Sequence, residues 1–158
     1  MNKTNTKKLA IAGVFCAVAV VGSLFSFPVF GSKCSPVQHM VNVICGVLLG
    51  PWYAFGAGFL AALIRNLFGL GSLLAFPGSM CGSLLCGFVW KYSKKLLPTL
   101  VGEVFGTGII GAILSYPVMT FLWGKEGLSW LFYVPSFICG TLIGGSIAYV
   151  FLRKFAAN

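Results

Sequence analysis

The chain has 158 residues, of which 58 % are hydrophobic and only 8 % are charged, and its mean hydropathy is +0.97. Because a soluble domain carries about 25 % charged residues, this composition excludes a soluble globular protein. The formal net charge of +9 does not indicate nucleic-acid binding, since the basic residues stand at the ends of apolar runs and not in a stripe with interleaved aromatics.

Six apolar runs approach the length of about 20 residues that a helix needs to cross a bilayer core of about 30 Å. Polar or Pro/Gly segments separate them, and the second run is short. The predicted spans are 9–30, 36–50, 52–69, 74–90, 97–123 and 129–152. The sequence therefore predicts an all-α membrane protein, a six-transmembrane-helix bundle that forms a single domain over residues 1–158.

The first run resembles a signal peptide in one respect, because Lys3, Lys7 and Lys8 precede it. It is nevertheless longer than the usual apolar core of about 7–15 residues, and no small-x-small cleavage site follows it. We therefore expect the run to be a membrane helix.

Basic residues are distributed unevenly between alternate connections. One side of the predicted bundle carries Lys3, Lys7, Lys8, Lys91, Lys94, Lys95, Arg153 and Lys154, and the other side carries Lys33 and Lys125. Because Lys and Arg accumulate on cytoplasmic loops, this asymmetry predicts that both termini are cytoplasmic.

Small residues recur four positions apart, a spacing that lets two helix backbones approach closely in a membrane. The pairs are Gly13/Ala17, Ala12/Cys16, Gly78/Gly82, Gly102/Gly106 and Gly140/Gly144. We expect most of them to pack inside the bundle, and the two pairs of the first run to be the best candidates for contact with an external partner.

Polar residues gather toward the outer half of the predicted bundle. In the second run, Gln38 and Asn42 lie four apart on one helical face, with His39 beside them. If other outer residues share their depth, these side chains form an outward-facing pocket with aromatic walls that suits a small planar ring. The other residues are Arg65, Asn66, Ser115, Tyr116, Tyr133 and Ser136. The simpler alternatives are snorkelling for Arg65, a satisfied interfacial histidine for His39, and an aromatic belt for the two tyrosines.

Glu103 lies in the inner third of the fifth run, where a charge costs about 2.5–3.5 kcal/mol on insertion scales. We expect a buried carboxylate bonded to neighbouring helices, or a gating element, unless the helix starts late and leaves Glu103 near the interface. Glu103 and His39 are expected at different depths, which would make them a poor proton relay.

Catalytic motifs are missing from the sequence. The chain contains no Asp, two Glu and one His, and it has no GxSxG, HExxH or Walker-type loop. Its six cysteines include no CxxC pair, so they predict neither a metal nor a redox site. We expect a protein that is not an enzyme and holds no cofactor.

Five ordered blocks of sequence carry a resemblance that covers essentially the whole chain. They occupy 31–42, 49–53, 65–67, 76–80 and 102–111, and the second contains Gly50-Pro51-Trp52. On these blocks the chain resembles the ThiW family, the thiazole-specific substrate-binding (S) components of energy-coupling factor (ECF) vitamin transporters.

The resemblance implies an S-component-like bundle in a prokaryotic plasma membrane that captures a thiamine precursor, hydroxyethylthiazole, from outside. It also implies a transmembrane coupling subunit and two ATPase subunits as partners, with release to the cytoplasm after the S component topples in the membrane. In the wider family helix 1 meets the coupling subunit through an Ala-xxx-Ala motif. The equivalents here are Gly13/Ala17 or Ala12/Cys16.

Hydroxyethylthiazole is neutral and aromatic, so it needs a stacking surface and a few hydrogen bonds. His39, Asn42 and Asn66 can donate to or accept from its ring nitrogen and hydroxyl. Arg65 would brace the pocket, while Glu103 and Thr107 would form its floor or hold the fifth helix. The candidate substrate-binding residues are Gln38, His39, Asn42, Arg65, Asn66, Glu103, Thr107, Tyr116 and Tyr133.

Three alternatives remain at this point. The chain is an S component for another precursor such as hydroxymethylpyrimidine or thiamine, a stand-alone secondary carrier coupled to protons through Glu103, or a structural membrane protein without a small ligand.

Overall fold

The fold is a bundle of antiparallel helices with one short hairpin. The structure, a computed structural model, describes residues 3–124, 127 and 129–156. Its elements are α1 (Lys3–Gly22), η1 (Ser23–Phe25), β1 (Phe27–Val29), β2 (Ser32–Cys34), α2 (Pro36–Leu48), α3 (Pro51–Leu67), α4 (Ala75–Ser93), α5 (Leu96–Phe105), η2 (Gly106–Gly111), α6 (Ala112–Trp123) and α7 (Val134–Ala156).

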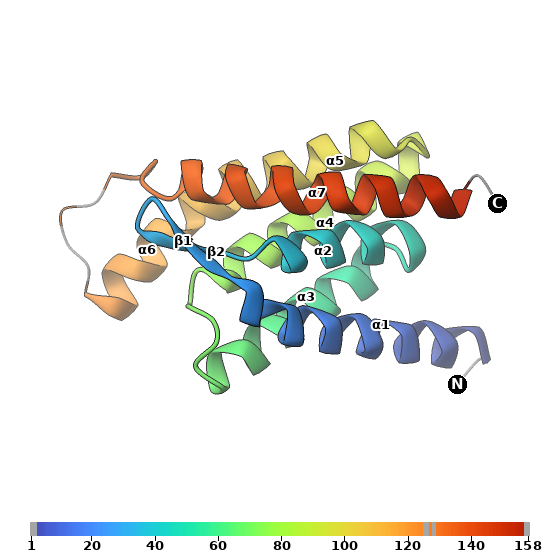
Figure 1. Ribbon diagram of the computed structural model, residues 1–158, viewed down its shortest axis with the longest axis horizontal. Coiled ribbons are helices and arrows are strands. Elements are labelled where there is room, and N and C mark those ends of the chain that lie inside the picture. Colours follow the sequence, from blue (N-terminus) through green and yellow to red (C-terminus); the bar gives the residue numbers. More distant parts are fainter. Residues whose placement is uncertain (1–2, 125–126, 128, 157–158) are drawn as a thin grey trace.

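The helices run along the long axis of the molecule, and both ends of the chain lie at the same end of the bundle (Figure 1). The hairpin and α6 lie at the opposite end. Within the described residues, three helical segments are long and apolar enough to cross a membrane, namely Lys3–Phe25, Leu96–Leu122 and Val134–Phe155. The helices α2, α3 and α4 match the three other predicted spans in position, whereas six membrane crossings stay a prediction.

The first predicted span, 9–30, was wrong at its end, because the chain leaves the helix after η1 and forms a hairpin. β1 pairs antiparallel with β2, with Val29 opposite Ser32. The connecting residues Phe30 and Gly31 both have positive φ, 45° and 77°, as a two-residue type I′ turn requires. Pro28 and this turn interrupt a run that hydropathy alone reads as continuous.

The fifth predicted span, 97–123, is one continuous helical segment whose middle part is π-helical. η2 is a π-helical segment between α5 and α6, and such segments occur mostly as single turns, frequently at functional sites. Its glycines allow α4 to lie close, since a Cβ at Gly111 would stand 2.7 Å from the Cα of Gly78.

Basic residues collect at the end of the bundle that holds the termini. The first turns of α1, the last turns of α4 and α7, and the α4–α5 connection carry Lys3, Lys7, Lys8, Lys91, Lys94, Lys95, Arg153 and Lys154. Lys33 and Arg65 belong to elements that meet at the other end. Lys125 lies outside the described residues.

Close packing between helices depends on glycine at a few contact points. The turn into α3 uses Gly50, whose φ of 91° is a conformation that other residues avoid, followed by Pro51 at the first helical position. Gly87 of α4 lies directly against this turn, because a Cβ there would stand 2.5 Å from the Cα of Pro51.

We expect Gly87→Ala to destabilise the protein by about 1–3 kcal/mol, because the added methyl group meets rigid backbone. Thermal unfolding of the purified protein in detergent measures the change. Gly56→Ala is the matched control, since Gly56 lies within α3 and a Cβ added there would meet no neighbouring group within 4 Å. Equal melting temperatures for the two variants would contradict the packing at Gly87.

Candidate binding site

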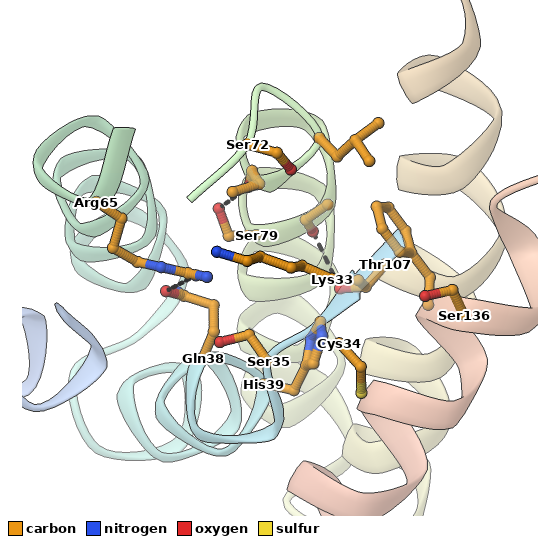
Figure 2. A pocket seen from close by; sticks show the side chains of 14 residues that line it. Lys33, Cys34, Ser35, Gln38, His39, Arg65, Ser72, Ser79, Thr107 and Ser136 are labelled. Carbon is orange, nitrogen blue, oxygen red and sulfur yellow. Dashed lines mark hydrogen bonds between the residues drawn. The ribbon is translucent and has the colours of Figure 1, made fainter. Parts of the chain in front are cut away.

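A cavity opens at the end of the bundle opposite the termini. The space open to the centre of a water-sized sphere is about 40 Å³, so the cavity is narrow. Figure 2 shows the side chains around it. The lining residues are Lys33, Cys34, Ser35, Gln38, His39, Arg65, Ser72, Leu74, Ala75, Gly78, Ser79, Thr107, Ser136 and Phe137.

Several elements contribute side chains because their ends converge here. α2 begins at Pro36, a residue suited to a first helical position, and its first turns point Gln38 and His39 into the cavity. Arg65 comes from the last turn of α3. Thr107 comes from η2, and Phe137 from the start of α7.

A chain of hydrogen bonds runs from the cavity wall into the core of the bundle. Arg65 Nη1 donates to Gln38 Oε1 at 3.2 Å, and Gln38 Nε2 donates to Asn42 Oδ1 at 3.0 Å. Asn42 Nδ2 then donates to Glu103 Oε1 at 3.1 Å. Because arginine only donates and a carboxylate only accepts, the two ends fix the orientation of both amides between them.

Glu103 is the inner end of this chain and is 0 % exposed. Its Oε1 lies 3.2 Å from His39 Nδ1, which donates in the tautomer that carries the proton there. Thr107 Oγ1 lies 3.0 Å from the same oxygen and 3.0 Å from the carbonyl oxygen of Gly78, and its single hydrogen serves one acceptor at a time. Glu103 Oε2 has no hydrogen-bond partner among the described residues.

Gly82 of α4 makes room for this polar group. A Cβ at that position would overlap the Thr107 hydroxyl and the Glu103 carboxylate. The Gly78/Gly82 pair was predicted as a helix contact, and the contact partner of Gly82 proves to be a buried polar side chain.

The structure brings together six of the nine predicted binding residues. Gln38, His39, Arg65 and Thr107 line the cavity, and Asn42 and Glu103 lie behind them in the hydrogen-bond chain. The expectation that Glu103 and His39 lie at different depths was wrong, because the tilt and close packing of α2 and α5 bring their side chains into contact.

Three predicted residues do not line this cavity. Asn66 donates to the carbonyl oxygens of Ala62 and Ser72, so it secures the connection between α3 and α4. Tyr116 packs against Trp130, with ring centroids 4.3 Å apart. Tyr133 is buried in an apolar cluster with residues that include Leu74 and Phe137. The residue type alone did not tell which neighbours these three side chains contact.

Sequence reasoning missed much of the mouth of the cavity. Lys33, Cys34 and Ser35 reach it because β2 packs against α7 and leads directly into α2. Phe137 supplies the aromatic wall in place of the tyrosines. It follows Tyr133 by four residues, a spacing that puts both on one helical face, so the sequence could have indicated it. Ser136 was expected here and does line the cavity.

Cys34 at the mouth is a buried thiol. Burial, and after it the neighbouring Cys139, raise the pKa of Cys34 to about 11. The thiol therefore stays protonated at neutral pH and is a poor nucleophile or metal ligand. No group of three or more His, Cys or carboxylate side chains that could hold a metal ion occurs in the described parts of the chain.

The first helix presents the two candidate partner pairs differently. Ala12 and Cys16 are buried against the core and form part of the floor of an apolar groove between α1 and α3. Gly13 and Ala17 are exposed, and nothing lies within 4 Å of a Cβ built on Gly13. Gly13/Ala17 is thus the pair that leaves its backbone open to another helix.

Comparison with known proteins agrees with this geometry. A solved S component of a bacterial ECF transporter has the same fold, with a TM-score of 0.80 and 18 % sequence identity over 97 % of each chain. No curated protein matches the sequence. The family model for ThiW, thiamine-precursor transporter protein, matches residues 9–158. Because that match covers nearly the whole chain, the protein belongs to the ThiW family of membrane transporter proteins, which are not enzymes, and it has the fold of an ECF-transporter S component.

Proposed function

We propose that this protein, as the S component of an ECF transporter, captures hydroxyethylthiazole from outside the cell for ATP-driven uptake by partner subunits. The observation that carries this proposal is a narrow cavity that combines hydrogen-bonding side chains with one aromatic wall. Phe137 offers an apolar ring face, while Gln38, His39 and Thr107 offer hydrogen-bonding groups along the same cavity. A small neutral heteroaromatic ligand needs this combination.

Ser136 supports the proposal independently. Its side chain is buried and lines the cavity, and its Oγ has no hydrogen-bond partner among the described residues. A buried hydroxyl without a partner costs about 1–3 kcal/mol. The ligand's hydroxyl or ring nitrogen would remove that cost.

The charge distribution supports an outward-facing cavity. Eight basic residues occupy the end that holds the termini, whereas the cavity lies at the opposite end. Because positive residues accumulate on the cytoplasmic side, we propose six membrane crossings, both termini in the cytoplasm and a prokaryotic plasma membrane as the location.

ATP-driven uptake requires other subunits to hydrolyse the ATP, since the sequence of this chain contains no nucleotide-binding loop. We propose a transmembrane coupling subunit that docks on α1, and two ATPase subunits on the cytoplasmic side. The exposed Gly13 and Ala17 would allow the backbone of a partner helix to approach closely.

One observation favours a second candidate, a stand-alone carrier coupled to protons. His39 and Glu103 are in contact at 3.2 Å beneath the cavity, and pairs of titratable groups inside a membrane are typical of proton relays. The two candidates differ in whether the isolated chain accumulates its ligand.

We expect the purified chain to bind hydroxyethylthiazole in calorimetry, and cells that express it without coupling subunits to show no accumulation. Hydroxymethylpyrimidine and thiamine complete the ligand panel. If one of these binds and the thiazole does not, the proposed substrate is wrong, but the protein remains a binding subunit of an ECF transporter. Accumulation without partners that Glu103→Gln abolishes would instead establish the secondary carrier.

Replacing Thr107 by Val should weaken ligand binding by about 1–3 kcal/mol, or roughly 5- to 150-fold, because it removes a hydroxyl from the cavity and a donor from the Glu103 cluster. Thr99→Val is the matched control. Thr99 is equally buried in α5, but its hydroxyl bonds the Lys95 carbonyl at 2.9 Å and does not line the cavity. Equal affinity in the two variants would exclude Thr107 from the site.

Leucine at both Gly13 and Ala17 should leave ligand binding unchanged and impair uptake by the complete transporter, because the added bulk keeps a partner helix away. Calorimetry and uptake assays separate the two effects. Leucine at Ser146 and Val150, on the exposed face of α7, is the control and should spare both. Lost binding in the α1 variant would place this face inside the folded monomer.

A further inference from the structure

We propose that the cavity contains an oxyanion subsite formed by Arg65 and Lys33, so that a thiazole bearing a carboxylate or phosphate group binds more tightly than the neutral alcohol. The proposal rests on the proposed function, because it names a substrate class for the same cavity.

Arg65 is the first observation. Its side chain lines the cavity and the residue is only 3 % exposed. Nη1 donates to Gln38, while Nε has no hydrogen-bond partner among the described residues. A guanidinium carries five N–H donors in a planar fork that matches a carboxylate or phosphate. Arg65 thus brings to the cavity wall a buried guanidinium with one donor bound to Gln38 and one donor, Nε, without a partner among the described residues.

The charge balance is the second observation. The chain contains two acidic residues, Glu103 and Glu126, and Glu126 lies outside the described residues. Glu103 Oε1 already has Asn42, His39 and Thr107 within hydrogen-bond distance, and no carboxylate of the described residues lines the cavity. Arg65 reaches Glu103 only through the amides of Gln38 and Asn42.

Lys33 brings a second positive charge to the same space. Its Nζ lies 3.4 Å from the carbonyl oxygen of Leu70, in the connection between α3 and α4. Figure 2 shows Lys33 and Arg65 extending toward one another from opposite sides of the cavity. The two cations repel each other, and no carboxylate of the described residues lies in the cavity to offset this. An oxyanion bound between them would attract both.

The helix ends add positive potential at the same place. α2, α4 and α7 all begin at the cavity, where Ser35, Ala75 and Ser136 from their first turns or caps line it. Each helix N-terminus acts as about half a positive charge. Burial away from water strengthens these contributions relative to their value at a surface.

The test compares three ligands on the purified full chain by calorimetry: hydroxyethylthiazole, its phosphate monoester and a thiazole carboxylate. We expect at least one anionic ligand to bind about tenfold more tightly than the alcohol, as a gained charge-assisted hydrogen bond allows. Lys33→Gln and Arg65→Gln should each reduce this preference to less than about threefold, mainly by weakening the anionic ligand.

Lys91→Gln is the control, because Lys91 is exposed near the far end of α4 and its loss changes the net charge by the same amount. If Arg65→Gln does not fold, Lys33→Gln alone decides, since Lys33 is exposed. Equal or tighter binding of the neutral alcohol, or an anionic preference that survives Lys33→Gln, would overturn the subsite and leave the proposed function intact. Failure of all three ligands to bind would remove both.

Discussion

The buried carboxylate of Glu103 is the constraint around which the polar part of this protein is organised. A carboxylate at that depth is tolerated only with hydrogen-bond donors around it, and Asn42, His39 and Thr107 supply them from α2 and η2. Each of these donors is held in turn by helix packing. The shape of the cavity therefore depends on a cluster whose position is fixed by hydrogen bonds to one buried carboxyl oxygen, Glu103 Oε1.

Glycine makes this arrangement possible, because polar side chains can enter a helix contact only where neighbouring side chains are small. Gly82 leaves the space that Glu103 and Thr107 occupy, and Gly140 and Gly144 of α7 lie against the His39 side chain and the start of α2. Association of helices in lipid relies on such close approach and not on hydrophobic burial. The shape of the cavity and the packing of the helices thus depend on the same residues.

The cavity and the exposed pair on the first helix are well separated. The cavity lies at the end of the bundle opposite the termini, and the exposed pair Gly13/Ala17 lies along the side of α1. In the transporter proposed above, this division would let partner contact change without altering the residues that line the cavity. Arg65, at the end of the hydrogen-bond chain, is the link between the core cluster and the cavity mouth.

The sequence by itself determined the membrane class, the positions of the helical runs to within a few residues, the charge asymmetry and the family, because hydropathy, glycine spacing and ordered motifs are properties of the linear chain. It also predicted Gln38, His39, Arg65 and Thr107 as binding residues, and these four line the cavity. It could not show the hairpin at 27–34, since Pro28 and a two-residue turn interrupt the run without a change in hydropathy. Only the tertiary structure decided which residues share a depth. It joined Glu103 to His39, brought Lys33 to the cavity and left Tyr116 and Tyr133 out of the cavity lining. The physical reason is that helix tilt and rotation depend on packing against other helices, and one helical run read alone carries no record of its neighbours.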